Sequence, residues 1–218
     1  MTVALRLGMV EAALASLFPP GVAVAAERIT PDRNGTLWPE ELAAIAGAVP
    51  ARQAEFAAGR TAARRCLAAL GLPPASLPIG SDRAAVWPAG VYGSISHAGG
   101  FAVAVAGVTS PLGVDLEVDA ALEPDLWPII CAAGEMPDLP DTDTGRLVRQ
   151  ILAAKEAVFK AQMPATRAMF GFEAVQVRLT DGGFAARYLQ DAGVIRAGTD
   201  LGGRFARVQG LILAGVAA

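Results

Sequence analysis

Cysteine and histidine are scarce in this sequence of 218 residues, which contains two cysteines, Cys66 and Cys131, and a single histidine, His97. Neither cysteine belongs to a C-x-x-C pair or lies near the histidine along the chain, so there is no zinc-binding pattern. Two isolated cysteines also provide no disulfide framework. We expect both to be ordinary buried thiols.

Long apolar runs are also lacking, because no segment approaches the roughly 18 uninterrupted apolar residues that a membrane-spanning helix requires. The segment before Glu27 superficially resembles a secretory signal, with an early arginine and an apolar stretch. However, Glu11 interrupts that stretch and Pro19-Pro20 ends it, while its apolar residues recur at helical spacing. We therefore expect a mature amphipathic segment, no membrane span and a cytoplasmic protein.

Excess positive charge is absent as well, since the net charge is −3, which argues against broad electrostatic binding to nucleic acid. Hydrophobic residues make up 53% of the chain and charged residues only 18%, which excludes an intrinsically disordered protein. The length of 218 residues fits one large domain or two halves of roughly 100 residues each.

The segment GVDLE, residues 113–117, places two carboxylates in what otherwise reads as a buried strand. Side chains two residues apart on a strand point to the same face, so Asp115 and Glu117 converge. Paired carboxylates on a rigid element suggest a hard cation such as Mg²⁺, whose remaining ligands are usually waters and substrate phosphates. The alternative is that one acid faces solvent while the other caps a backbone group or pairs with an arginine.

Two long helices are predicted. The first covers residues 51–70 and ends at Gly71 and Pro73, with Arg52 and Arg60 beside its apolar face. These guanidinium groups suggest an anion site, although their stems could instead cover the core while their heads stay solvated. The second covers residues 144–162, ends before Pro164, and places Lys155 in the middle of its apolar face.

A lysine at the centre of an apolar face is costly to bury unless an anion meets it. Glu156 and Lys160 lie along one border of the same helix, four residues apart. Their alternative interpretation is a simple surface pair worth about 0.2–0.5 kcal/mol.

Strand segments follow each of the two long helices, so we predict an α+β fold. One strand ends at Ser96-His97, a Gly99-Gly100 turn follows, and an apolar strand covers residues 101–108. This hairpin places His97 and Asp115 on neighbouring strands. A short buried helix near Trp127 and an acidic loop, MPDLPDTDTG, precede the second long helix. Three strand segments close the chain, EAVQVRL, GFAARYL and RFARVQGLILAGV, separated by DGG and LGG turns.

Four sequence blocks together resemble the 4′-phosphopantetheinyl transferases, specifically the branch of enterobactin synthetase component D. They are the helix with Arg52, Phe56, Arg60 and Arg64, then WPAGVYGSISH (87–97), GVDLE (113–117) and AAKEAVFKAQ (153–162). The resemblance covers about residues 50–180. It implies an α+β fold of two similar halves, residues 1–110 and 111–218, with the active site in the cleft between them.

The resemblance also implies an activity, the Mg²⁺-dependent transfer of phosphopantetheine from coenzyme A to a serine of an apo carrier protein, releasing adenosine 3′,5′-bisphosphate. By matching position, Mg²⁺ would be held by Asp115, Glu117 and Glu156. Coenzyme A would be contacted by Lys155 and Lys160 at its phosphates, by Arg52, Arg60 and Ser96-His97 near the 3′-phosphate, and by Arg83. Glu156 would be the base for the carrier serine, directly or through a water, and Lys160 would assist catalysis.

The family further implies siderophore, nonribosomal peptide, polyketide or fatty-acid carriers as partners, and a monomer is the simplest arrangement of two similar halves. Two alternatives use the same residues: another Mg²⁺-dependent phosphoryl or nucleotide hydrolase, and a noncatalytic protein that binds coenzyme A or a carrier. One departure from the family lies at CAAGEMPD, residues 131–138, where members often carry an acidic residue with a basic neighbour.

Overall fold

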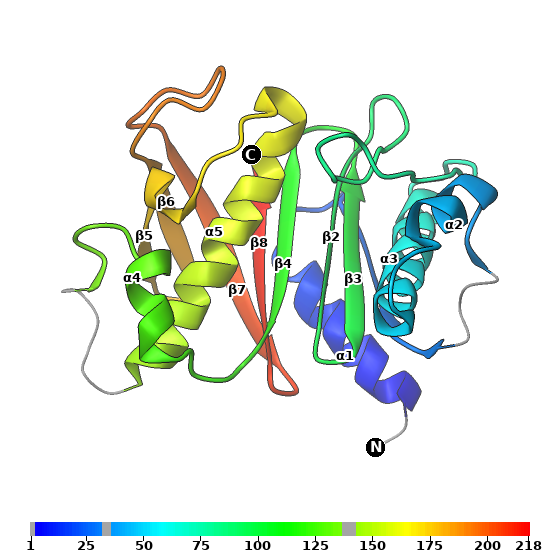
Figure 1. Cartoon of the computed structure of the whole chain (residues 1–218), viewed down its shortest axis with the longest axis horizontal. Coiled ribbons are helices and arrows are strands. Elements are labelled where there is room, and N and C mark those ends of the chain that lie inside the picture. The colour runs from blue at the N-terminus through cyan, green and yellow to red at the C-terminus, as the bar shows by residue number, and fades with distance from the viewer. Residues whose placement is uncertain (1–2, 32–35, 137–142) are drawn as a thin grey trace.

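The computed structural model describes residues 3–31, 36–136 and 143–218, and it has an α+β fold (Figure 1). The α-helices are α1 (Val3–Ala15), α2 (Pro39–Ile45), α3 (Pro50–Ala69), α4 (Trp127–Ile130) and α5 (Thr144–Thr166). The strands are β1 (Ala23–Arg28), β2 (Tyr92–Ala98), β3 (Phe101–Gly107), β4 (Leu112–Val118), β5 (Val175–Thr180), β6 (Gly183–Tyr188), β7 (Asp200–Val208) and β8 (Leu211–Ala217). Two short 3₁₀ helices cover Pro124–Leu126 and Phe172–Ala174.

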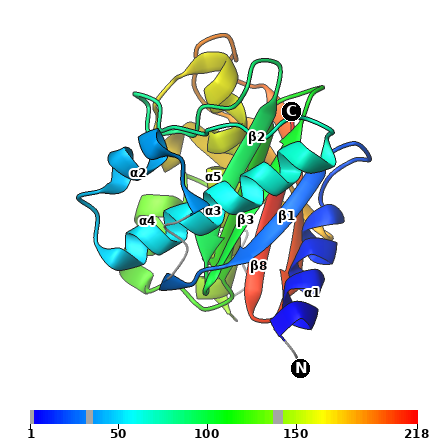
Figure 2. The ribbon, with the colours of Figure 1, turned by 90° about the vertical axis from the view of Figure 1, so that its right-hand side faces the viewer.

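The first sheet is antiparallel with the order β1-β3-β2, and α3 lies across one of its faces (Figure 2). Small residues make this contact, because Ala104 and Ala106 of β3 pack against Ala62 and Ala63 of α3. The short side chains let helix and sheet approach closely. Cys66 is buried in the same layer, as expected, and burial raises its pKa to about 12. Cys131 is only partly buried.

The second sheet has the order β4-β8-β7-β6-β5, all antiparallel, and α5 covers one of its faces. The helix crosses β4 at Gly113, where an added Cβ would lie 1.8 Å from the carbonyl oxygen of Ala157. Glycine is therefore the residue that allows α5 to lie directly on the strand carrying Asp115 and Glu117.

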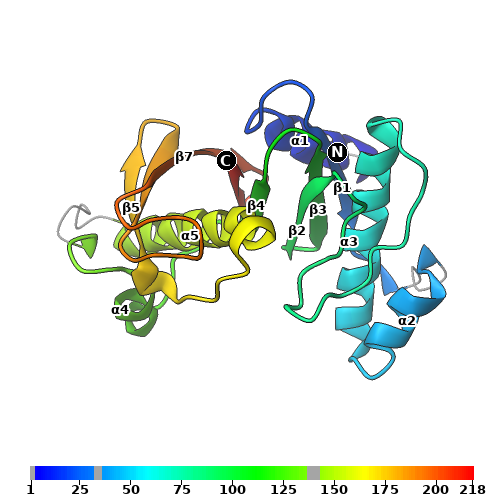
Figure 3. The same ribbon diagram turned by 90° about the horizontal axis from the view of Figure 1, so that it is seen from above.

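The two sheets meet where their edge strands, β2 and β4, lie side by side (Figure 3). No backbone ladder joins these strands. Each is the outermost strand of its own sheet, where β2 pairs with β3 and β4 pairs with β8. Serine side chains join them instead: Ser94 Oγ accepts from Val114 N at 3.0 Å, and Ser96 Oγ accepts from Leu116 N at 3.3 Å. The expected proximity of the His97 strand and the Asp115 strand is thus present, but across a seam between sheets.

Helix α1 packs behind this seam, on the side away from α5 (Figure 3). Its Val10 and Leu14 are fully buried in a core that includes Val103 of β3 and Val114 of β4. The expected amphipathic segment therefore forms part of the core between the two sheets. Strand β1, which follows it, was not predicted.

The last two strands correct the sequence interpretation. The LGG segment, residues 201–203, was expected to be a turn, but it lies within β7. The turn falls at Gln209-Gly210, where both residues have positive φ, 53° and 74°, as a two-residue hairpin of type I′ requires. Helix α5 also continues past Pro164, whose missing N–H costs only one backbone bond in the last turn.

Within the described residues, no helix is long and apolar enough to cross a membrane. Two predicted loops fall partly outside the described residues: the turn-rich segment 30–39, of which 32–35 are not described, and the acidic loop 136–145, of which 137–142 are not described.

Candidate active site

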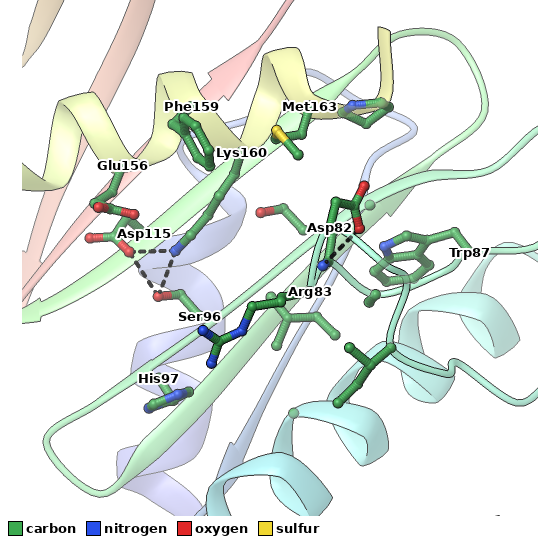
Figure 4. Close-up of a pocket in the computed structure, with 18 of the residues that line it drawn as sticks. Asp82, Arg83, Trp87, Ser96, His97, Asp115, Glu156, Phe159, Lys160 and Met163 are labelled. Carbon is green, nitrogen blue, oxygen red and sulfur yellow. Dashed lines mark hydrogen bonds and ion pairs between the residues drawn. The ribbon is translucent and has the colours of Figure 1, made fainter. Parts of the chain in front are cut away.

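A cavity of about 760 Å³ lies between the two sheets, lined by α3, the loop 79–87, β2, β4 and α5 (Figure 4). It gathers nine of the predicted site residues: Arg52, Arg60, Arg83, Ser96, His97, Asp115, Glu117, Glu156 and Lys160. These residues come from segments more than 100 positions apart in the chain, so the fold brings them together. Lys155 is the exception and does not line this cavity.

Asp115 is the most constrained carboxylate of the cavity, with only 4% of its surface exposed. Its Oδ1 accepts from Lys160 Nζ at 2.6 Å and from Ser96 Oγ at 2.8 Å (Figure 4). Its Oδ2 is buried and has no hydrogen-bond partner among the described residues. A buried carboxylate oxygen without a partner is costly, so this atom is one that a cation would satisfy.

Glu117 lies two residues further along β4 and meets Arg149 of α5, whose Nη1 is 2.9 Å from Glu117 Oε2. Burial, followed by the charge of Asp115, raises the pKa of Glu117. Half of the alternative considered from the sequence is therefore present: one acid pairs with an arginine, but the other, Asp115, is buried and does not face solvent. The pairing leaves the second oxygen of Glu117 without a hydrogen-bond partner among the described residues.

Glu156 projects from α5 toward Asp115 (Figure 4). The pKa of Glu156 is raised, mainly by burial. The Lys160 ammonium opposes this rise, and the charge of Asp115 adds to it. Because Asp115 also acts on Glu117, the three carboxyls share one electrostatic environment.

The described residues contain no preformed cluster of three His, Cys, Asp or Glu side chains that could hold a metal ion. The three carboxyls nevertheless fit Mg²⁺, because hard oxygen donors are the ligands this ion takes and Asp115 Oδ2 is unsatisfied. Asp115, Glu117 and Glu156 are the residues that could hold it.

Basic side chains from α3 and β2 also line the cavity. Arg52 Nη1 lies 2.6 Å from His97 Nε2, and Glu55 is within 3.7 Å of the same ring nitrogen. Burial is the main cause that lowers the pKa of His97, and the neighbouring Arg52 lowers it further. In this arrangement the neutral imidazole accepts a hydrogen bond from Arg52.

Arg60 is held more rigidly than Arg52. Its Nε donates to the carbonyl oxygen of Leu77 at 2.6 Å, and its guanidinium lies 4.1 Å from the centre of the Phe56 ring. Only 6% of its surface is exposed, and burial lowers its pKa to about 10. The head of Arg60 is therefore inside the protein, whereas the alternative interpretation placed it in solvent. Arg83 extends into the same cavity from the loop 79–87 (Figure 4).

Lys155 points elsewhere. Its ammonium is almost fully buried and donates to Glu135 Oε2 at 2.8 Å and to the carbonyl oxygens of Ile130 and Phe172. The anion that a lysine on this apolar helix face was expected to need is the carboxylate of Glu135. The sequence interpretation missed Glu135, because it lies in the non-periodic CAAGEMPD segment; the expected phosphate contact of Lys155 stays a prediction.

A second cavity of about 190 Å³ adjoins the first, since Glu156 and Phe159 line both. The remaining lining is mostly apolar: Lys155, Phe170, Gly171, Phe172 and Val175. The sequence offered one signal for it, the aromatic residues that follow α5. The first cavity is lined by many charged side chains, whereas the second, called the apolar annex below, is mostly apolar. Glu156 and Phe159 line both.

Two family models match the sequence. Residues 38–107 match the 4′-phosphopantetheinyl transferase N-terminal domain, and residues 111–201 match the 4′-phosphopantetheinyl transferase superfamily. Together these matches cover more than half of the chain, including every predicted site residue.

Curated relatives agree. The sequence is 37% identical to 4′-phosphopantetheinyl transferase Svp of Streptomyces mobaraensis over 200 residues, 85% of this chain and 80% of the relative. It is 34% identical to 4′-phosphopantetheinyl transferase PptT of Mycobacterium tuberculosis over 194 residues, 83% of this chain and 86% of the relative. Enterobactin synthase component D of Escherichia coli K12 is 38% identical over 140 residues, 62% of this chain and 66% of the relative.

Proposed function

Because the chain belongs to the 4′-phosphopantetheinyl transferase superfamily, and so is an enzyme that transfers phosphopantetheine to carrier proteins, we propose that its donor is coenzyme A and its metal ion Mg²⁺. The second product is then adenosine 3′,5′-bisphosphate. The observation that carries this proposal is the unpartnered, buried Oδ2 of Asp115, a residue that lines a cavity together with both carboxylates and basic side chains.

The lining of the cavity suits both the 3′-phosphate and the diphosphate of the nucleotide. Arg52, Arg60 and His97 supply fixed donors for the 3′-phosphate, and a guanidinium offers the planar fork that phosphate recognition uses. Arg83 reaches the cavity from the opposite wall. We assign the 3′-phosphate end to the half 1–110 and the metal and diphosphate end to the half 111–218.

Mg²⁺ would supply charge stabilisation to the phosphoryl oxygens when it is bound by Asp115, Glu117 and Glu156. Lys160 is held beside Asp115 and Ser96, so its ammonium is fixed where negative charge develops on the departing phosphate. Glu156 accepts the proton of the carrier serine, directly or through a water, and the pKa raised by burial makes its carboxylate a better base.

The serine oxygen forms a bond to the phosphorus that carries pantetheine, and the bond from this phosphorus to the bridging oxygen breaks. The bisphosphate leaves with the bonding electron pair, while the serine proton passes to Glu156. The apolar annex next to Glu156, lined by Phe159, Phe170 and Phe172, is suited to the pantetheine arm.

Carrier identity is the open part of the proposal. Similarity to enterobactin synthase component D supports siderophore carriers. We further propose that the enzyme acts in the cytoplasm as a monomer.

The experiment is to incubate the enzyme with coenzyme A, Mg²⁺ and a panel of apo carriers and to measure intact carrier mass. A gain of one phosphopantetheine supports the proposal. Cleavage of coenzyme A without a carrier product would indicate a hydrolase, and binding without reaction would indicate a noncatalytic protein. Asp115→Ala should abolish transfer, whereas Asp119→Asn, a carboxylate four residues further on that does not line the cavity, should retain it.

A further inference from the structure

The two carboxylates of β4 share a pattern that the proposed function does not use. Each is bound by a cation from α5 through one oxygen only. Asp115 is held at Oδ1 by Lys160, 2.6 Å away, and Glu117 is held at Oε2 by Arg149, 2.9 Å away. The other oxygen of each carboxylate has no hydrogen-bond partner among the described residues.

The side chains of Arg149 and Lys160 are themselves held by hydrogen bonds to the backbone, which restricts their rotation away from the carboxylates. Arg149 Nε donates to the carbonyl oxygen of Ala120 at 3.1 Å, and its side chain is only 19% exposed. Lys160 Nζ also donates to the carbonyl oxygen of Val114 at 3.2 Å. Each basic side chain is therefore anchored to the backbone of β4 or of the segment just after it.

This geometry restricts how the carboxylates can meet a cation. A carboxylate with one oxygen engaged by an anchored guanidinium or ammonium has one oxygen left, so it binds a metal ion through a single atom. Mg²⁺ and Mn²⁺ accept single-oxygen ligands at octahedral sites and keep waters, whereas Ca²⁺ takes six to eight oxygens and uses bidentate carboxylates readily.

We propose that Arg149 is a metal-selecting residue, which holds Glu117 to single-oxygen ligation and thereby disfavours Ca²⁺ relative to Mg²⁺ and Mn²⁺. The inference rests on the proposed function, since it takes Glu117 as a ligand. Arg149 acts through Glu117 and touches no reacting atom, so it is a positioning residue. Lys160 is not used for the test, because the proposed function assigns it to the phosphates.

The test measures metal binding directly. Mn²⁺ is titrated into the enzyme with coenzyme A present, free Mn²⁺ is followed by its paramagnetic resonance signal, and Mg²⁺ or Ca²⁺ is then added as competitor. Arg149→Met removes the cation and keeps an apolar stem, and Arg149→Gln keeps a donor for the Ala120 carbonyl, which protects the fold. In both variants we expect the ratio of Ca²⁺ to Mg²⁺ affinity to rise about tenfold, the lower end of the effect of residues around metal ligands.

The control is Arg146→Met, one turn earlier on α5, because Arg146 makes only a 3.6 Å exposed pair with Asp143. It should keep the wild-type ratio. If both Arg149 variants still bind Mn²⁺ and keep the wild-type ratio of Ca²⁺ to Mg²⁺ affinity, the role given to Arg149 is wrong, while the proposed function is unaffected. Failure of the wild-type enzyme to bind Mn²⁺, or unchanged Mn²⁺ binding in Asp115→Asn, overturns the proposed metal site instead.

Discussion

The ammonium of Lys155 and the carboxylate of Glu135 form an ion pair of 2.8 Å whose two side chains are 2% and 0% exposed. Glu135 also accepts from the backbone N–H groups of Ala132 and Val177, and Lys155 donates to two carbonyl oxygens. The pair therefore joins α5, β5 and the segment after α4.

Breaking this pair should destabilise the fold. Glu135→Gln or Lys155→Met leaves one buried charge uncompensated, and we expect a loss of about 3–5 kcal/mol in the free energy of unfolding. Urea denaturation measures it, and the double variant should lose less than the sum of the single losses. If Lys155 contacts phosphate as the sequence suggested, Lys155→Met will also raise the KM for coenzyme A while Glu135→Gln will not.

His97 should change its protonation when a nucleotide binds. Burial and Arg52 hold its pKa below the ordinary value in the free protein, so the imidazole is neutral at neutral pH. A 3′-phosphate beside it stabilises the imidazolium, which raises the pKa. Binding of adenosine 3′,5′-bisphosphate should therefore take up a proton and weaken as the pH rises through the pKa of the bound state.

Because His97 is the chain's single histidine, its ring resonances in a proton NMR titration need no assignment. An identical titration curve with and without the bisphosphate would place the 3′-phosphate elsewhere. Arg52→Ala serves as the comparison, and it should raise the pKa of His97 in the free protein.

Gly113→Ala should be poorly tolerated. The new Cβ would lie 1.8 Å from a backbone oxygen of α5, which cannot move without shifting the helix. We expect a loss of about 3 kcal/mol or more, the upper end for overpacking, together with reduced transfer activity. Gly202→Ala is a matched control on β7, where a Cβ meets nothing within 4 Å and the backbone conformation is unstrained. Equal unfolding midpoints for the two variants would contradict the role given to Gly113.

Asp82 and Arg167 should influence the affinity for coenzyme A. Their 2.8 Å ion pair links the loop carrying Arg83 to the end of α5, and Asp82 Oδ1 also accepts from Ala84 N, which fixes the turn. Because exposed pairs contribute up to about 1 kcal/mol, Arg167→Ala should raise the KM for coenzyme A about two- to fivefold and leave kcat unchanged.

The matched control for Arg167 is Arg196→Ala. Arg196 is exposed to a similar extent and makes a 2.7 Å pair with Asp191, but it does not line the cavity. The effect of Arg167→Ala should also fade at high salt, which screens the pair. A change in kcat with KM unaffected would show that Arg167 acts on the chemical step.

Local periodicity was sufficient to predict on which face of their elements several of these side chains lie, while their proposed roles came from the family resemblance. Alternation along β4 put Asp115 and Glu117 on one face, and the helical wheel of α5 put Glu156 and Lys160 on its border and Lys155 in its apolar centre. These are properties of single elements, which the period of 2 or 3.6 residues encodes directly. The α+β class and both long helices were confirmed for the same reason.

Which charged side chains pair with each other could not be predicted from local periodicity. Arg149 and Glu117 are 32 residues apart, and Lys155 and Glu135 are 20 apart, so only the tertiary fold decides that they meet. The hairpin at Gln209-Gly210 was missed because LGG is the stronger glycine signal, although a paired strand can hold both glycines. Serine at position 94 likewise gave no sign that its hydroxyl would bind the neighbouring sheet.

The seam between β2 and β4 has a consequence for solubility. An open strand edge is a template on which another chain can add a strand. Here the free edges of two sheets face each other, and the hydroxyls of Ser94 and Ser96 occupy backbone N–H groups of β4 that would otherwise await a partner. Any opening of the cleft wide enough to part these strands exposes both edges at once. The two serines that line the cavity therefore also cover part of the β4 edge against pairing with another chain.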